Sequence, residues 1–483
     1  MRSGRNRSDY SHYLSLSRGM FGTTKNALWV YQRCVSCFLL NDSIRKAFRR
    51  LPTTIEWARF RKNARRMREL RGRGIFEFLS REVLSALQLH IINEPLLPNL
   101  KTLCFWKLLG PFSPFISLFL SPGITSITLV FGIDCPEAIV ASTVSSLPKL
   151  CPKLRSICLQ SQTPWVPFQP PSGDLMNTVA ISGMVLATNR NTLRRFLVDS
   201  PLTEEASGVV CKLPNLRHLS VIIGRETSLP SASLPNLTTL AITCDNEDDW
   251  PRLFHGATFG KLESVMFFPQ SSEIGDFLGA FKRAALSSSI QNTLLTLQIR
   301  PSCSWNPIYS SLLPFRQLVD LNIKFSCGDG CSSRVDDDIV ISLSRAMPKL
   351  SVLRLGYSPC GEFTTGVTAK GLIALALRCP NLRSLCVHFH VNSLSVLPTD
   401  PGISHNTEPT GSWTNCALTN LAVGEMLVPE ESVLLVTLAL LRIFPRIENI
   451  YHFDDGWKEV EDAIRLSKRI ADCSSKKQAL TTR

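Results

Sequence analysis

A short pattern of apolar residues recurs along most of this chain. It consists of an apolar residue, two further residues, a second apolar residue, one residue and a third apolar residue. The last two apolar positions are two residues apart, which places both side chains on one face of a β-strand. One such unit is too small to bury its apolar face alone, so neighbouring units must stack. The apolar triplets of the complete units are Leu100/Leu103/Phe105, Ile124/Ile127/Leu129, Leu154/Ile157/Leu159, Leu193/Phe196/Val198, Leu216/Leu219/Val221, Leu237/Leu240/Ile242, Leu262/Val265/Phe267, Leu294/Leu297/Ile299, Leu318/Leu321/Ile323, Leu350/Leu353/Leu355, Leu382/Leu385/Val387 and Leu418/Leu421/Val423.

Several of these units open on the same phrase. Leu-Pro-Asn-Leu stands at residues 97–100, 213–216 and 234–237, and close variants occur elsewhere. A further triplet, Ile447/Ile450/His452, breaks the pattern at its last position, so we expect it to be a terminal unit. The spacing of the units varies, which predicts an irregular stack with loops rather than a regular one.

This pattern resembles the leucine-rich repeat family and covers about Leu97 to Phe453. The resemblance implies strands that form a parallel sheet with helices behind them. We therefore predict an α/β fold, an irregular leucine-rich-repeat solenoid with a short helical N-terminal region.

The segments between several strands have helical signatures. The segment 335–346 has acids near its start, Asp336–Asp338, which suit a helix N-terminus. The segment 368–378 begins with a threonine that can cap a helix. Pro429 with two glutamates opens a third predicted helix that runs to about Phe444. Two stretches rich in Pro, Gly or Ser are predicted loops, 164–173 and 391–415.

The segment Ile44–Arg73 is rich in arginine and carries apolar residues every three or four positions. This spacing predicts one helix with an apolar stripe and basic residues around it. Such a helix could cap the stack with its charged face solvated, or it could contact phosphates or act as a nuclear-localisation signal. The stripe consists of Trp57, Phe60, Ala64, Met67 and Leu70.

Several phrases resemble fungal F-box proteins with leucine-rich repeats. The N-terminal ones are Ala27-Leu28-Trp29, Leu51-Pro52, Trp57-Ala58-Arg59-Phe60 and the run from Ala64 to Leu70. At the other end they are Leu421-Ala422-Val423-Gly424, the apolar stretch after Pro429, Ile443-Phe444-Pro445 and Trp457. In that family an F-box docks on the Skp adaptor of a cullin ubiquitin ligase, and the repeats hold the substrate.

The resemblance implies an adaptor-binding role for Leu28 and Trp29. The opening motif of that family, Leu-Pro followed by an acidic residue and Ile, does not occur in residues 1–25, so we expect a truncated F-box. The expected organisation is a disordered or truncated N-terminus (1–26), a basic helical region (27–90), the repeat solenoid (91–457), and a C-terminal helix and tail (458–483).

Composition narrows the classes of protein that this chain can belong to. Of 483 residues, 44% are hydrophobic and 19% are charged, as in globular proteins. The net charge of +14 comes from residues 1–73, which hold 18 of the 53 Lys and Arg, so a uniformly basic nucleic-acid-binding surface is not expected. The chain shows no secretory signal, no membrane span and no disulfide framework among its 16 cysteines. We expect a soluble protein of the cytoplasm or nucleus.

A search for catalytic motifs finds no phosphate-binding loop, zinc-protease motif or serine nucleophile elbow. We therefore predict a protein that is not an enzyme, with no catalytic residue, no cofactor and no metal site. The acidic run Asp336–Asp338 could bind a cation, but a helix N-terminus explains it better.

The strand residues that alternate with the buried positions face away from the core. In the later units many of them are polar or basic, and they would form a patch on a body without net charge. We predict that this patch binds a protein with acidic or phosphorylated residues, although any solvated sheet face also needs polar side chains. The predicted partner-binding residues are Gln298, Arg300, Asn322, Lys324, Arg354, His388 and His390.

The expected function is a non-catalytic substrate-recognition subunit of a cullin-type (SCF) ubiquitin ligase. The alternative is a repeat-only interaction scaffold without ligase coupling. Binding of a Skp-type adaptor distinguishes the two. An enzyme carried on the repeats and a nucleic-acid-binding basic helix are weaker alternatives.

Overall fold

A computed structural model describes most of the chain, and it divides into two compact units, Met1–Ser200 and Pro201–Arg483. Each unit is considered by itself. The described residues are 53–72, 81–90, 95–108, 110–132, 135–161, 185–202, 204–223, 233–244, 258–269, 279, 281–283, 285–286, 290–299, 306–324, 335–355, 366–396, 416–424, 428–452 and 455–481.

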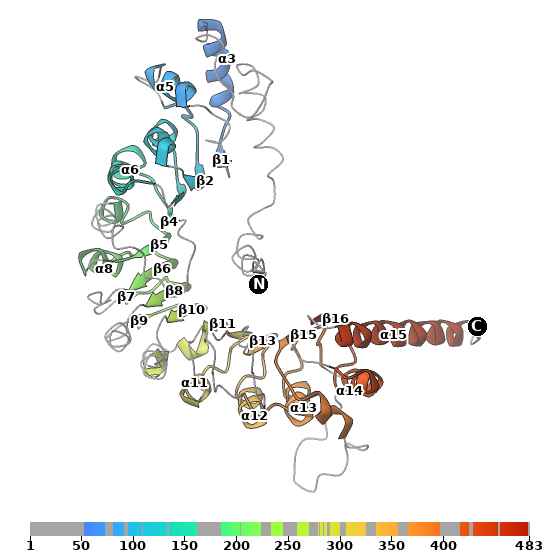
Figure 1. The fold of residues 1–483 in the computed structure, drawn as a ribbon. Coiled ribbons are helices and arrows are strands. Elements are labelled where there is room, and N and C mark those ends of the chain that lie inside the picture. Colours follow the sequence, from blue (N-terminus) through green and yellow to red (C-terminus); the bar gives the residue numbers. More distant parts are fainter. Residues whose placement is uncertain are drawn as a thin grey trace, which may run out of the picture. The chain divides into compact units, whose positions relative to one another are not determined.

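The first unit contains a parallel sheet with strand order β1-β2-β3-β4-β5 (Figure 1). Its strands are β1 Glu69–Gly72, β2 Thr102–Leu108, β3 Ser126–Phe131, β4 Ser156–Ser161 and β5 Arg195–Pro201. Its helices are α3 Thr54–Ala64, α5 Arg81–His90, the 3₁₀ helix η1 Gly110–Phe119 and α6 Glu137–Leu150.

The predicted N-terminal helix is shorter than its apolar stripe. Helix α3 ends at Ala64, and Leu70 lies in strand β1, where it pairs with Leu103 of β2. Met67 and Leu70 are buried because they occupy the first two core positions of a further repeat. The apolar pattern of the sequence did not reveal this repeat. The prediction of one continuous helix was therefore wrong, and among the described residues the first strand of the sheet begins at Glu69.

The second unit repeats the same architecture with strand order β6-β8-β10-β11-β12-β13-β14-β15-β16. These strands are β6 His218–Ile223, β8 Thr239–Cys244, β10 Ser264–Pro269, β11 Thr296–Ile299, β12 Asp320–Ile323, β13 Val352–Leu355, β14 Ser384–Cys386, β15 Asn420–Gly424 and β16 Asn449–His452. Strands β7 Ser233–Leu234 and β9 Thr258–Phe259 form a separate pair. The helices are α8 Glu204–Val210, η3 Ile290–Asn292, α11 Asn306–Leu312, α12 Asp337–Ala346, α13 Ala369–Arg378, η4 Val391–Val396, η6 Glu430–Ser432, α14 Val433–Ile443 and α15 Asp455–Thr481.

The register of the strands confirms the predicted repeat. In both compact units, the central apolar residue of each repeat pairs with the central apolar residue of the next repeat. Leu321 pairs with Leu353 in this way, and Leu353 pairs with Leu385. These residues are fully buried. In each compact unit, stacking of the repeats thus forms an apolar core between strands and helices, as in a solenoid.

The phrase that opens many units also ends the preceding helix. In four cases a buried residue donates its backbone N–H to the carbonyl oxygen of the leucine four positions earlier. The next residue is a proline, which cannot continue the helix. The donors are Cys151, Met347, Cys379 and Phe444, with N···O distances of 2.7 to 2.9 Å. Proline and the preceding buried residue therefore place the next core leucine at a fixed distance from the helix end.

Hydrogen bonds between successive units fix their stacking. The carbonyl oxygen of Val319 accepts from the backbone N–H groups of both Ser351 and Val352, at 2.8 and 3.0 Å. The asparagine of the Leu-Pro-Asn-Leu phrase adds a further link, since Asn236 Nδ2 donates to the carbonyl oxygen of Pro214 at 2.9 Å. These bonds satisfy backbone groups that the turns would otherwise leave unpaired.

The last strand and helix close the second unit. The broken triplet does end the strand order, because β16 is its final strand and holds His452 in place of an apolar residue. Helix α15 packs on this end through the fully buried Trp457, whose ring meets that of Phe389 edge to face at 6.0 Å. His452 Nε2 lies 3.6 Å from a carboxylate oxygen of Glu461 on α15.

Candidate functional site

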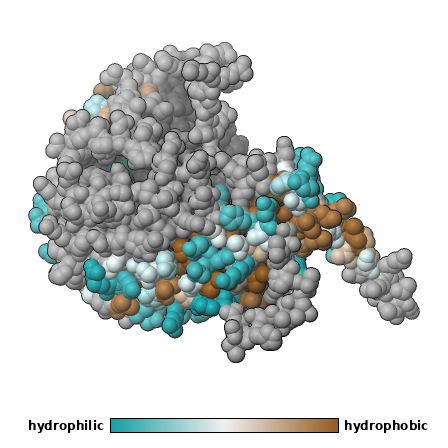
Figure 2. Space-filling view, turned by 60° about the horizontal axis from the view of Figure 1, so that its bottom comes forward, coloured by the Kyte–Doolittle hydropathy of each residue, from teal (hydrophilic) through white to brown (hydrophobic). Residues whose placement is uncertain are grey.

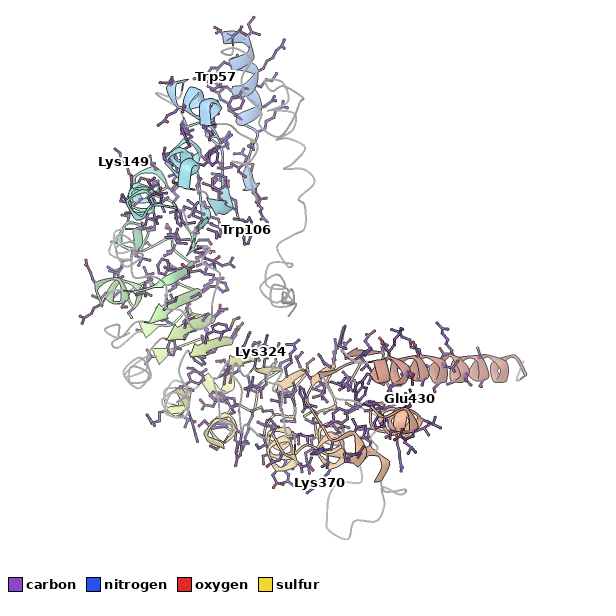
Figure 3. The ribbon with its side chains drawn as sticks, in the orientation of Figure 1. Trp57, Trp106, Lys149, Lys324, Lys370 and Glu430 are labelled. Atoms are coloured by element: carbon purple, nitrogen blue, oxygen red, sulfur yellow. The ribbon has the colours of Figure 1, made fainter. Side chains whose placement is uncertain are left out.

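Side chains on one face of the second unit's sheet point away from helices α11, α12 and α13. We call this surface, over strands β10 to β14, the β-face. In β11, β12 and β13 half-buried and fully buried residues alternate, so the predicted alternation is confirmed. Figure 3 shows Lys324 on this side of the strands and Lys370, at the start of α13, on the other.

One row of the β-face crosses five strands in register. Met266 pairs with Gln298, Gln298 with Asn322, Asn322 with Arg354, and Arg354 with Cys386. Neighbouring strands lie about 4.8 Å apart, so these side chains form a continuous line that is apolar at β10 and polar or basic at β11 to β13. The structure thus brings together three of the predicted residues, Gln298, Asn322 and Arg354.

An acidic residue that the sequence analysis missed lies beside this row. Asp320 precedes Asn322 by two positions on β12, and one of its carboxylate oxygens is 3.8 Å from a guanidinium nitrogen of Arg354. Both side chains are about one-third exposed. Burial raises the pKa of Asp320, and the nearby Arg354 opposes that shift. The same alternation, read one step earlier along the strand, would have placed Asp320 on the β-face.

The charges of two cations of the β-face affect the pKa of a buried thiol. Burial raises the pKa of Cys386 to about 11, while the charges of Arg354 and Lys324 lower it. Both cations therefore lie close to the end of the row at β14. A thiol with so high a pKa is almost fully protonated at neutral pH, which makes it a weak nucleophile there.

The two predicted histidines lie beyond the sheet. Strand β14 ends at Cys386, although the next residue, Val387, still donates its backbone N–H to the carbonyl oxygen of Ala422 in β15, at 3.4 Å. His390 is exposed, but its backbone N–H donates to the carbonyl oxygen of Val367, just ahead of helix α13, at 2.8 Å. The strand therefore ends before His390. His388 is half-buried and closer to the row, two residues past the end of β14.

Three predicted site residues lie outside the described residues. They are Arg300, which directly follows β11, and the adaptor-binding pair Leu28 and Trp29. Their predicted roles remain predictions.

The acidic run at residues 336–338 caps helices. Asp336 is the N-cap of α12 and accepts the backbone N–H of Ile339 at 3.0 Å. Asp337 accepts hydrogen bonds at the start of the next helix, α13, from Thr368 and Gly371. The interpretation as a helix N-terminus is therefore confirmed.

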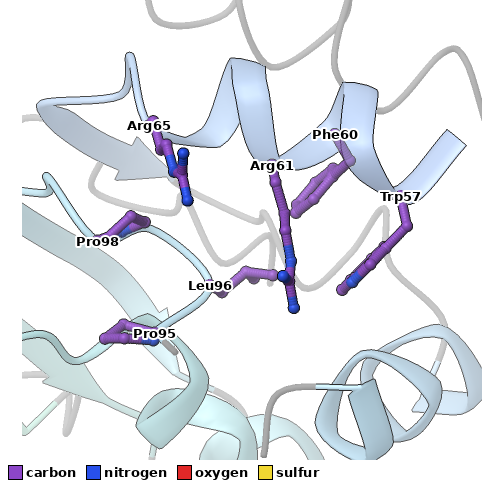
Figure 4. Close-up of a pocket in the computed structure, with 7 residues that line it drawn as sticks. All are labelled: Trp57, Phe60, Arg61, Arg65, Pro95, Leu96 and Pro98. Carbon is purple, nitrogen blue, oxygen red and sulfur yellow. The ribbon is translucent and has the colours of Figure 1, made fainter. Parts of the chain in front are cut away.

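A second surface feature lies in the first unit, where helix α3 meets the turn before β2 (Figure 4). The rings of Trp57 and Phe60 stack at 5.1 Å, and the Arg61 guanidinium lies 5.9 Å from the Trp57 ring centre. With Arg65, these side chains line a shallow pocket whose other wall is Pro95, Leu96 and Pro98. Asn99 Nδ2 holds the end of α3 by donating to the Arg65 carbonyl oxygen at 2.7 Å.

The chemistry of the β-face suits binding. Its described side chains offer amide, ammonium and guanidinium donors and one carboxylate. Among the described residues, no group of three or more His, Cys, Asp or Glu side chains could hold a metal ion. Within the same ranges, no helix has the length and apolarity needed to cross a membrane.

Comparison with known proteins adds a distant structural likeness. No protein-family model matches this sequence, and no curated protein matches it. Among solved structures, a chain of the crystal structure of the Rad7 and Elc1 complex in yeast is similar, with a TM-score of 0.37 and 14% sequence identity. The match covers 76% of this chain and 78% of that chain.

Proposed function

We propose that this protein is a leucine-rich-repeat substrate-recognition subunit of a cullin-type ubiquitin ligase, which binds its protein partner through the β-face. The observation that carries the proposal is the row from Met266 to Arg354, in which an apolar end is followed by amides and a guanidinium. Such a line complements an extended peptide that carries acidic or phosphorylated residues. The protein would act by holding a substrate near a transferring enzyme, without bond-making chemistry of its own.

The ligase part of the proposal rests on the resemblance of residues 27–70 and of the C-terminal phrases to F-box proteins. The partner part rests on the β-face. The two parts are separable, because a repeat protein without an adaptor would still bind through its sheet. The second candidate function is therefore a repeat-only interaction scaffold.

Charge reversal tests the partner part. The variant Arg300→Glu/Arg354→Glu should weaken capture of cellular phosphoproteins by the full chain by about tenfold or more, because each lost charge-assisted hydrogen bond contributes about 1.5–3 kcal/mol. Arg316→Glu, an exposed position outside the β-face, is the matched control. Thermal unfolding of each variant checks that the fold persists. Equal capture by a folded double variant and the parent would refute the β-face as the binding surface.

Adaptor binding tests the ligase part. Purified Skp adaptor should bind the full chain and should lose binding to Leu28→Asp/Trp29→Asp. If the adaptor does not bind the parent chain, the scaffold function stands and the ligase function fails.

A further inference from the structure

The turns that lead into strands β1 to β5 of the first unit carry a row of cations (Figure 1). In each of these five repeats, one residue lies between the first core position and the strand, and in four of them it is Arg or Lys. We call these five residues the basic row: Arg68, Lys101, Thr125, Arg155 and Arg194. All four cations are exposed.

Backbone hydrogen bonds fix the members of the basic row one behind the other. The carbonyl oxygen of Arg68 accepts from the backbone N–H of Lys101 at 2.7 Å, and that of Lys101 accepts from Thr125 at 2.9 Å. The same bond joins Thr125 to Arg155 at 2.7 Å, and Arg155 to Arg194 at 2.8 Å. Neighbouring strands lie about 4.8 Å apart, so the four steps of the row form a line about 19 Å long. The stacking of the repeats thus sets the position of each cation.

Hydroxyl groups, rather than carboxylates, follow most of the basic row. Thr102, Ser126 and Ser156 are the first residues of β2, β3 and β4, and they pair in register. Among the first residues of the five strands, the one carboxylate is that of Glu69, and it pairs with Arg71. Like charges side by side on adjacent strands repel each other, so the row is unfavourable in the free protein. An anion along the row would relieve this repulsion.

The same position in the second unit does not have this basic character. Its first five members are Arg217, Thr238, Glu263, Leu295 and Val319, which the same backbone hydrogen bonds join. The exposed surface differs again toward the C-terminal part of the molecule, where Figure 2 shows hydrophobic surface gathered. The turn before a strand therefore accepts acidic and apolar residues as well as basic ones, and the repeat itself does not require the four cations of the first unit.

We propose that the basic row binds the phosphate backbone of a single-stranded nucleic acid. Arg, Lys, Ser and Thr side chains are the groups that contact phosphate oxygens in such complexes. The carbonyl oxygens of Arg68, Lys101, Thr125 and Arg155 each accept two backbone N–H groups already, so the row offers charge and hydroxyls rather than main-chain acceptors for a peptide. A flexible strand with one charge per nucleotide can follow a line whose spacing the protein sets. This inference goes beyond the proposed function and does not depend on it, because the β-face lies in the second unit.

Fluorescence anisotropy tests the proposal, with a labelled oligo(dT) strand of about 20 nucleotides and the full chain at several salt concentrations. The variant Arg68→Gln/Lys101→Gln/Arg155→Gln/Arg194→Gln should bind at least about tenfold more weakly than the parent. Its plot of log affinity against log salt should be shallower by about 2–3, because each phosphate contact on a single strand contributes about 0.7 to the slope. Thermal unfolding checks that the variant folds. A parent that does not bind the strand, or a folded variant that keeps the parent's slope, would overturn the proposal.

Four exposed cations of the second unit provide the matched control, since their loss changes the net charge equally. The variant Lys261→Gln/Arg316→Gln/Lys370→Gln/Lys458→Gln should keep the slope of the parent. Equal losses in the two fourfold variants would mean that net charge alone drives binding, and the assignment to the basic row would fail. A labelled poly-glutamate peptide of about 20 residues tests an acidic protein as the ligand and should bind more weakly than oligo(dT) at the same salt concentration. If the peptide binds the parent as tightly as the strand does, the row does not select nucleic acid and the proposal is wrong.

Discussion

The carboxylate of Asp337 in helix α12 accepts a hydrogen bond from the backbone N–H of Gly371 in helix α13, at 3.0 Å. The same carboxylate accepts from the backbone N–H and the hydroxyl of Thr368, at 2.8 and 2.6 Å. Asp337 thus satisfies the N-terminal donors of the next repeat's helix, while Asp336 caps its own. One short acidic run therefore fixes both the start of α12 and the position of α13.

We expect Asp337→Ala to lower the free energy of unfolding by about 1–3 kcal/mol, because it leaves partly buried donors without an acceptor. Asp338→Ala is the matched control, since Asp338 is exposed and contributes only through the helix dipole, about 0.3–1 kcal/mol. Urea denaturation of the full chain measures both. Equal losses in the two variants would contradict the cross-helix role of Asp337.

Gly371 provides an independent check of the same contact. A Cβ atom at this position would lie 2.6 Å from the Asp337 carboxylate oxygen, so alanine must displace the carboxylate. In the parent, Gly371→Ala should therefore be destabilising despite the better helix propensity of alanine. In the Asp337→Ala background the same change should be less destabilising than in the parent, because only the approach of Val367 Cγ1 at 3.2 Å remains. An equal loss of stability in both backgrounds would refute the argument.

Asp320 makes the stability of the second unit depend on pH. Because burial raises its pKa in the folded state, the folded protein binds a proton more tightly there than the unfolded chain does. Stability contributed by the protonated form is therefore lost as pH rises from about 4 through the raised pKa. We expect Asp320→Asn to be more stable than the parent at pH 7 and to lose this advantage toward pH 4, as measured by urea denaturation at each pH. A parent that is more stable at pH 7 would show that the Arg354 pair outweighs burial.

The cysteines should differ sharply in reactivity. Burial raises the pKa of Cys104, Cys211 and Cys386 to about 11 from an ordinary 9.0, which lowers the thiolate fraction at pH 8 by about a hundredfold. Cys473 on α15 is exposed. Among the four cysteines named here, brief alkylation with iodoacetamide, followed by peptide mass spectrometry, should modify Cys473 first, and urea should remove the difference. Labelling of Cys386 at the rate of Cys473 in the folded protein would contradict its burial.

The strands were predictable because their signal is local. Leu321 and Ile323 are two residues apart in the sequence and must therefore share a face in a strand, whatever surrounds them. Leu70 was assigned to a helix because its spacing from Phe60 and Met67 fits a helical period equally well. Only the pairing with Leu103 decides for a strand, since that pairing buries Leu70 in the first repeat.

The β-face was predictable only in part. Alternation along single strands placed Gln298, Asn322 and Arg354 on one face, and the register confirms that they form one row. The contact between Asp320 and Arg354 joins residues on different strands, so it depends on register. The backbone hydrogen bond of His390 to Val367 joins residues of different repeats, so no local sequence pattern predicts it.

By itself, the sequence determined the repeating strand units, the positions of their core leucines and the prolines that end helices, because each follows from the stereochemistry of a few consecutive residues. The tertiary structure decided which residues of different units meet. It placed Asp337 at the start of the next helix and Asp320 beside Arg354. Stacking sets these contacts, since the offset between units is fixed by packing and hydrogen bonds between residues about thirty positions apart in the chain.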